Sequence, residues 1–186
     1  MLGAAEADAF GAELHRGARV IGRVAVDADA ELADLVGPTH QRAELAGQFR
    51  LDHRHAAGQH LADRAVDLAL RAQVAQERRR GKLPETDAPA GGVFALAMGK
   101  GGARELNYSS DIDLIVLFDD AAYADGDHQE ARAALIRATR KMATMLSEVT
   151  EHGYVFRTDL RLRPDAAVTP VCISTAAALA YYEAEG

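Results

Sequence analysis

The chain has 186 residues, 48% of them hydrophobic, and its 28 Asp and Glu against 21 Lys and Arg give a formal net charge of −7. This composition is typical of a globular protein, and the acidic balance argues against a nucleic-acid partner, which normally meets a basic surface. No run of about 18 apolar residues and no apolar N-terminal stretch occurs, which predicts a cytoplasmic protein without membrane span or signal peptide. The single cysteine, Cys172, excludes a disulfide within the chain.

The first part of the chain, residues 1–82, is predicted to be a helical N-terminal segment. Residues 1–60 are rich in Ala, Asp and His, and they suggest short helices that are broken at Gly37-Pro38 and at Gly58.

A longer helix is predicted from Leu61 to Arg80, because small and apolar residues recur along one helical face. Arginines in its last turn suit the negative end of the helix dipole, and Gly81 is a stop signal. The next ten residues, 83–92, have the composition of a linker.

From residue 93 the pattern changes to short strands with helices between them. The predicted elements are a strand over 93–98, a short helix after Gly99, a strand over 111–118, a long amphipathic helix over 127–150, an alternating strand over 154–164, a strand over 168–174 and a last helix capped by Ser174. This order predicts an α+β fold in which a small mixed β-sheet core, residues 93–186, is flanked by helices and preceded by the helical segment.

Two aspartates stand at the start of the strand predicted over 111–118. Residues two apart in a strand point to the same face, so Asp111 and Asp113 are predicted to project together, in line with Ile115 and Leu117. Neighbouring carboxylates repel each other unless a cation neutralises them, and Mg²⁺ binds carboxylates together with substrate phosphates. The pair predicts a site for Mg²⁺, with Mn²⁺ as the alternative ion. The competing interpretation is a strand that simply ends in charges at the surface.

A glycine-rich turn, Gly99-Lys100-Gly101-Gly102, precedes these aspartates. Glycines let backbone amides approach a phosphate closely, and Lys100 supplies a positive charge, so the turn predicts phosphate binding. The turn is not a Walker A loop, because the spacing of its glycines and the residue after Lys100 do not match that motif. The alternative for Lys100 is an ordinary surface charge.

A third carboxylate, Asp159, lies in the alternating stretch. The alternation predicts that Asp159 shares a strand face with Arg157, Arg161 and Arg163. A carboxylate among arginines suits a metal-bound phosphate ester, whereas the alternative is a solvated strand face.

These motifs resemble those of a known family. The segments GKGGARELNYSSDIDLIVLF and GYVFRTDLRLRPDA resemble the nucleotidyltransferase core of the bacterial bifunctional glutamine synthetase adenylyltransferase/adenylyl-removing enzymes, in the DNA polymerase β-type superfamily. The resemblance covers roughly residues 61–183, and the stretch from Asn107 to Asp113 is more similar to the N-terminal, adenylyl-removing half of that family. Gly101 departs from the large apolar residue that is usual there. By the same resemblance, the core over 93–186 is incomplete at its C-terminus.

The resemblance implies a two-metal mechanism with Asp111, Asp113 and Asp159 as catalytic residues and metal ligands. The candidate nucleotide- and phosphate-binding residues are Gly99, Lys100, Gly102, Ser110, Arg161 and Arg163.

The implied reaction is deadenylylation, the phosphorolysis of adenylyl-tyrosine on glutamine synthetase to ADP, as part of the regulation of nitrogen assimilation. The implied partners are glutamine synthetase, ATP or ADP, phosphate and a PII-type signalling protein. Adenylylation from ATP would use the same site geometry and stays open. The alternative function is a truncated, non-catalytic fragment that binds nucleotide or glutamine synthetase.

Overall fold

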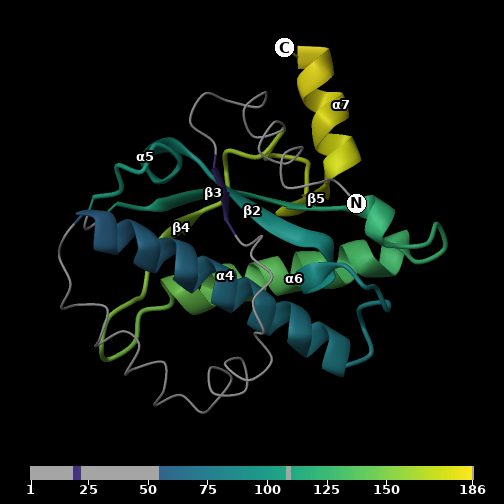
Figure 1. Ribbon diagram of the computed structural model, residues 1–186, viewed down its shortest axis with the longest axis horizontal. Coiled ribbons are helices and arrows are strands. Elements are labelled where there is room, and N and C mark those ends of the chain that lie inside the picture. Colours follow the sequence, from purple (N-terminus) through teal and green to yellow (C-terminus); the bar gives the residue numbers. More distant parts are fainter. Residues whose placement is uncertain (1–18, 22–54, 108–109, 186) are drawn as a thin grey trace.

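The computed structural model describes residues 19–21, 55–107 and 110–185 (Figure 1). The helices and strands are, in chain order, β1 (Arg19–Ile21), α4 (His55–Arg79), the 3-10 helix η1 (Pro89–Gly92), β2 (Val93–Ala97), α5 (Gly99–Gly102), β3 (Ile112–Phe118), the 3-10 helix η2 (Asp120–Ala122), α6 (His128–Ser147), β4 (Thr158–Asp159), β5 (Cys172–Ser174) and α7 (Thr175–Glu185). The α+β class is confirmed. Most of the short helices predicted over 1–60 fall outside the described residues, as do Tyr108 and Ser109 of the aspartate motif.

The strands form one mixed sheet. Its order is β1-β2-β3-β4, and β5 also pairs with β3. β1, β2 and β3 are antiparallel neighbours, whereas β4 and β5 both run parallel to β3. β4 pairs with the start of β3, at Ile112 and Asp113, and β5 pairs with its end, from Val116 to Phe118. Two short strands therefore share one edge of β3.

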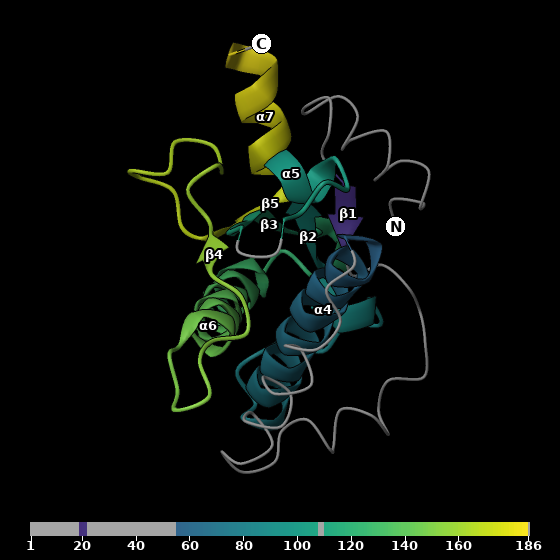
Figure 2. The ribbon, with the colours of Figure 1, turned by 90° about the vertical axis from the view of Figure 1, so that its left-hand side faces the viewer.

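Helices cover the two faces of this sheet unequally. α4 and α6 lie next to each other across one face, and α7 projects from the opposite side near the end of β5 (Figures 1 and 2). The start of α7 is fixed by two caps: Ser174 Oγ accepts a hydrogen bond from the Ala177 amide at 3.2 Å, and Asp120 Oδ1 accepts one from the Ala176 amide at 3.3 Å. The cap predicted at Ser174 is confirmed.

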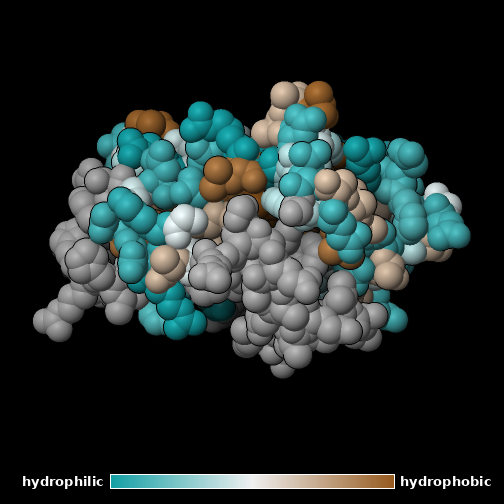
Figure 3. All heavy atoms as spheres, turned by 90° about the horizontal axis from the view of Figure 1, so that it is seen from above, coloured by the Kyte–Doolittle hydropathy of each residue, from teal (hydrophilic) through white to brown (hydrophobic). Residues whose placement is uncertain are grey.

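The described part of the surface is mainly hydrophilic. Figure 3 shows small, separate hydrophobic patches on the face seen from above. The large hydrophobic side chains that are exposed lie in the segment 149–168 and on α7, and they are Val149, Tyr154, Leu162, Val168, Leu179 and Tyr181. No helix among the described residues is long and apolar enough to cross a membrane.

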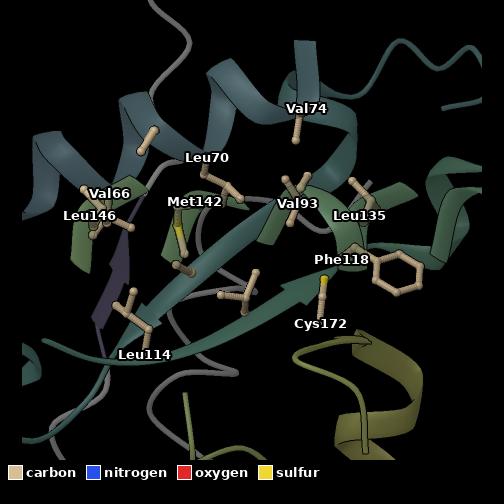
Figure 4. Packing of buried hydrophobic residues seen from close by; sticks show 14 of the residues in the cluster. Val66, Leu70, Val74, Val93, Leu114, Phe118, Leu135, Met142, Leu146 and Cys172 are labelled. Carbon is tan, nitrogen blue, oxygen red and sulfur yellow. The ribbon is translucent and has the colours of Figure 1, made fainter. Parts of the chain in front are cut away.

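β3 divides its side chains between two hydrophobic cores. The core under α4 and α6 (Figure 4) takes the even-numbered residues of the strand, Ile112, Leu114, Val116 and Phe118. The core on the α7 side takes Ile115 and Leu117 with Leu96, Ile173 and Ala178. This alternation, predicted from the sequence, is confirmed, and it fixes the side of the sheet that Asp113 faces.

Several predicted boundaries differ from the structure. Gly58 does not break a helix but lies inside α4, because one glycine costs only about 1 kcal/mol in a long helix that packs against its neighbours. Residues Arg19–Ile21, within the predicted helical segment, form a strand on the free edge of β2. The predicted linker contains η1, where the Gly91 carbonyl oxygen accepts a 2.6 Å hydrogen bond from the buried Tyr123 hydroxyl.

The alternating strand predicted over 154–164 is wrong in its extent. Only Thr158 and Asp159 pair with β3, and turns follow from Arg161 onward. The reason is that the rest of this edge of β3 belongs to β5, so residues after Asp159 have no strand to pair with.

Candidate active site

The start of β3 brings together the carboxylates that the sequence singled out. Asp113 lies on the side of β3 opposite the α4–α6 core, and Asp111 is exposed just before the strand begins. Because β3 and β4 are parallel, Asp113 is the direct register partner of Asp159. Side chains at paired positions of neighbouring strands point to the same face, so these two carboxylates are neighbours although 46 residues separate them in the chain.

The backbone of Gly99 lies close to the side chain of Asp113. Its φ of +52° lies in the left-handed region, and a Cβ added to it would stand 2.9 Å from Asp113 Oδ2. The amide of Met98 donates a 2.9 Å hydrogen bond to the backbone oxygen of Asp113, which fixes this turn against the strand. Glycine is thus needed at residue 99 both for its backbone conformation and for the close approach of the Asp113 carboxylate.

The surroundings of Asp113 disfavour its negative charge. Burial raises the pKa of its carboxyl group, and the negative charges of Asp159 and Asp111 raise it further, while Arg161 opposes this. Three carboxylates therefore act on each other here, which is the situation that a bound cation relieves.

Arginines pair with the other two carboxylates. Arg157 Nε lies 2.6 Å from Asp111 Oδ1, and Arg161 Nη2 lies 2.5 Å from Asp159 Oδ2. The hydrogen bond from the Arg161 side chain lowers the pKa of Asp159 despite the partial burial of that carboxyl group. Both acids are thus paired with arginine side chains of the protein itself.

The sequence matches a family over the whole of this region. The family model described as glutamate-ammonia ligase adenylyltransferase matches residues 41–186. The chain belongs to this family.

Relatives of known name agree with this membership. Proteins called bifunctional glutamine synthetase adenylyltransferase/adenylyl-removing enzyme are 51% identical over 147 residues in Bradyrhizobium sp. strain BTAi1, 48% over 150 residues in Mesorhizobium japonicum and 46% over 148 residues in Xanthobacter autotrophicus. Each match covers 77% of this chain and 15% of the relative. The chain therefore spans a small part of the length of these relatives.

For this member of the adenylyltransferase family, the structure places the predicted phosphate-binding residues in two groups. Gly99, Lys100 and Gly102 lie in α5, where Lys100 is exposed and the Gly102 amide donates to the Met98 oxygen at 3.0 Å. Ser110 lies just before Asp111 and is half-buried. The turn and the aspartates thus lie at the same end of β3.

The second group is the pair of arginines after β4. Arg161 is exposed beside Asp159, whereas Arg163 turns to the backbone of its own loop. The Arg163 guanidinium donates to the carbonyl oxygens of Leu160 at 2.6 Å, Ala166 at 2.8 Å and Thr169 at 3.1 Å. These bonds fold the loop, so only Arg161 of this pair presents its guanidinium at the carboxylates.

The carboxylates fit a divalent cation in their chemistry, since they supply the hard oxygen donors that Mg²⁺ requires. In the conformation described, however, no group of three or more His, Cys, Asp or Glu side chains within residues 55–107 and 110–185 is arranged to hold a metal ion. Two of the three carboxylates bind arginines instead.

Two features of the site were missed by the sequence analysis. The contact of Gly99 with Asp113 was missed because the glycine turn was interpreted only as a phosphate site. The pairing of Arg157 with Asp111 was missed because alternation assigns a face to a residue but not a partner. The spacings Asp-x-Asp and Arg-x-Asp-x-Arg were an available signal for the arginine pairing, whereas the sequence held no signal for the contact of Gly99.

Proposed function

We propose that this chain carries a nucleotidyl-transfer site that acts on glutamine synthetase and removes adenylyl groups from it. The observation that supports this most is the register pairing of Asp113 with Asp159, which gathers acidic side chains from distant segments at one end of β3. The membership in the adenylyltransferase family and the names of the relatives support glutamine synthetase as the substrate.

The proposed ligands of Mg²⁺, or of Mn²⁺ in its place, are Asp111, Asp113 and Asp159. When bound there, such ions polarise a phosphoryl group and offset the negative charge that develops on the leaving oxygen. The two-metal mechanism is part of this proposal, because three carboxylates would supply oxygen donors for more than one such ion.

The protein's own residues position the reactants. In phosphorolysis, an oxygen of inorganic phosphate attacks the adenylyl phosphorus, the bond from phosphorus to the tyrosine oxygen breaks, and the tyrosine takes up the proton that phosphate brings. The products are ADP and unmodified glutamine synthetase.

Arg161 is the proposed contact for the incoming phosphate, with Lys100, Ser110 and the glycines of α5 beside it. Arg163 positions the loop that carries Arg161. A PII-type signalling protein is the proposed regulator.

The reaction and its direction can be tested together. Adenylylated glutamine synthetase with phosphate and Mg²⁺ is expected to release ADP when this chain is added, and the Asp113→Asn variant is expected to release none. A parallel reaction with unmodified glutamine synthetase and ATP measures adenylylation. Faster adenylylation than deadenylylation would reverse the proposed direction. Nucleotide binding without either reaction would favour the non-catalytic alternative.

A further inference from the structure

We propose that Arg157 and Arg161 close the carboxylate site against cations, and that a divalent cation must displace their guanidinium groups from Asp111 and Asp159. This inference rests on the proposed function, because it concerns the same carboxylates. It assigns Arg157 and Arg161 a role as positioning residues that act through Asp111 and Asp159.

The contact of Arg161 with Asp159 uses both carboxylate oxygens. Nε of Arg161 lies 3.0 Å from Oδ1 and 2.9 Å from Oδ2, and Nη2 lies 2.5 Å from Oδ2. The backbone amide of Arg161 also donates to Oδ1 at 2.8 Å. A cation therefore cannot reach Asp159 in this arrangement unless the guanidinium leaves. The amide bond does not depend on the guanidinium, so it keeps the carboxylate oriented afterwards.

Arg157 contacts one oxygen of Asp111, with Nε 2.6 Å from Oδ1, and its guanidinium also lies 5.9 Å from the centroid of the Tyr154 ring. The two pairs together explain why the three aspartates do not close around a common point among the described residues. The guanidinium groups occupy oxygen atoms of Asp111 and Asp159, and their release makes these oxygens available to a cation beside Asp113.

The guanidinium groups can leave at low cost. The side chain of Arg161 is 85% exposed and that of Arg157 is 55% exposed, so both can move into water. The exposed pair of Arg157 with Asp111 contributes little to stability, whereas the bidentate pair of Arg161 with the partly buried Asp159 is the stronger competitor of a cation. The backbone need not move, because Arg163 braces the loop through its bonds to Leu160 and Ala166.

Displacement has a direct consequence for phosphate. Once the Arg161 guanidinium has left Asp159, its N–H groups have no acceptor there. They can then donate hydrogen bonds to a phosphate oxygen beside the cation site. Arg161 would thus serve both as the partner of Asp159 and, once displaced, as a phosphate contact.

The exchange can be followed by NMR on the full chain with ¹⁵N-labelled arginine. The Nε–H signals of Arg157 and Arg161, assigned by their loss in Arg157→Lys and Arg161→Lys, are expected to shift as Mg²⁺ is added. The Nε–H signal of Arg163, which donates to the Thr169 carbonyl oxygen at 3.2 Å, is the internal control and should stay in place. A second control is Arg137, whose Nε donates to Glu77 far from the site.

Calorimetric titration with Mg²⁺ gives an independent measurement. Arg161→Ala is expected to bind Mg²⁺ about fivefold more tightly than the wild type, because the competing group is gone. Arg140→Ala, which removes an exposed arginine on α6, controls for the change in net charge and should leave the affinity unchanged.

The outcomes separate this inference from the proposed function. Mg²⁺ binding that leaves the Arg161 signal in place, with unchanged affinity in Arg161→Ala, would overturn the displacement but keep the carboxylate site. Absence of Mg²⁺ binding in both the wild type and Arg161→Ala would overturn the inference and the proposed site together. Binding by Arg161→Ala but not by the wild type would also overturn the displacement, because the cation would then be unable to release the guanidinium of the natural chain.

Discussion

Replacing Gly99 by alanine is expected to destabilise the protein by about 1–3 kcal/mol and to displace the Asp113 carboxylate. An alanine at a φ of +52° is strained, and its Cβ would stand 2.9 Å from Asp113 Oδ2. The carboxylate is the flexible partner in this clash, so it rotates away and the site loses its arrangement. Thermal unfolding should show a Tm lower by about 2–4 °C for each kcal/mol.

Gly101→Ala is the matched control in the same helical turn. Gly101 has no positive φ, and the nearest atom to an added Cβ is the Ala97 Cβ at 3.8 Å, an ordinary contact. Alanine is a better helix former than glycine, so this variant is expected to gain about 0.5–1 kcal/mol. Equal effects of the two substitutions would show that Gly99 has no special relation to Asp113.

Replacing Glu77 by glutamine is expected to lower the free energy of unfolding by about 1.5–3 kcal/mol. Glu77 on α4 is fully buried, and its carboxylate joins α4 to α6. Oε2 accepts from Arg137 at 2.9 Å, and Oε1 accepts from Lys141 at 3.2 Å. A glutamine keeps the shape but turns an N–H group toward these cations. Chemical denaturation measures the loss, and Glu85→Gln on the exposed segment after α4 should change stability by less than about 0.5 kcal/mol.

The stability that Glu77 contributes should depend on pH in a defined direction. Burial raises the pKa of this carboxyl group, but the hydrogen bonds and charges of Arg137 and Lys141 lower it more, so the net shift is below the ordinary value of 4.5. A carboxyl group with a lowered pKa in the folded state stabilises the protein fully above its unfolded pKa, and this contribution is lost as the pH falls through the folded pKa. The difference between wild type and Glu77→Gln should therefore be constant near neutral pH and shrink in acid. A difference that grows on acidification would contradict this account.

The sequence predicted best those features that depend on local geometry. Side-chain alternation is a property of a single strand, so the partition of β3 between two cores followed from the positions of Asp113, Ile115 and Leu117 alone. The existence of α6 and the cap at Ser174 also followed from local signals, although α6 ends at Ser147, three residues before its predicted end.

The features that were missed depend on which partners are available in space. The alternation from Tyr154 to Pro164 is that of a strand, but β5 occupies the edge of β3 that such a strand would need. The contact of Gly99 with Asp113 brings two segments together, and the two arginines pair with the carboxylates of Asp111 and Asp159. The alternation of side chains along a single strand predicts neither contact. Because β4 and β5 pair with the same edge of β3, β5 limits how far the strand at Asp159 can extend.

The central claim is that the aspartates at the start of β3 form one cation-dependent site for nucleotide phosphates. Titration of ADP into the protein with and without Mg²⁺, followed by calorimetry, tests it most directly. Asp119→Asn, one residue beyond the other end of β3, is the matched control for the loss of one negative charge, and asparagine can still accept the hydrogen bond of the Ala121 amide. The account predicts Mg²⁺-dependent ADP binding by the wild type and Asp119→Asn, and an affinity lower by about tenfold or more in Asp113→Asn. Equal Mg²⁺-dependent binding by the wild type and Asp113→Asn would contradict it.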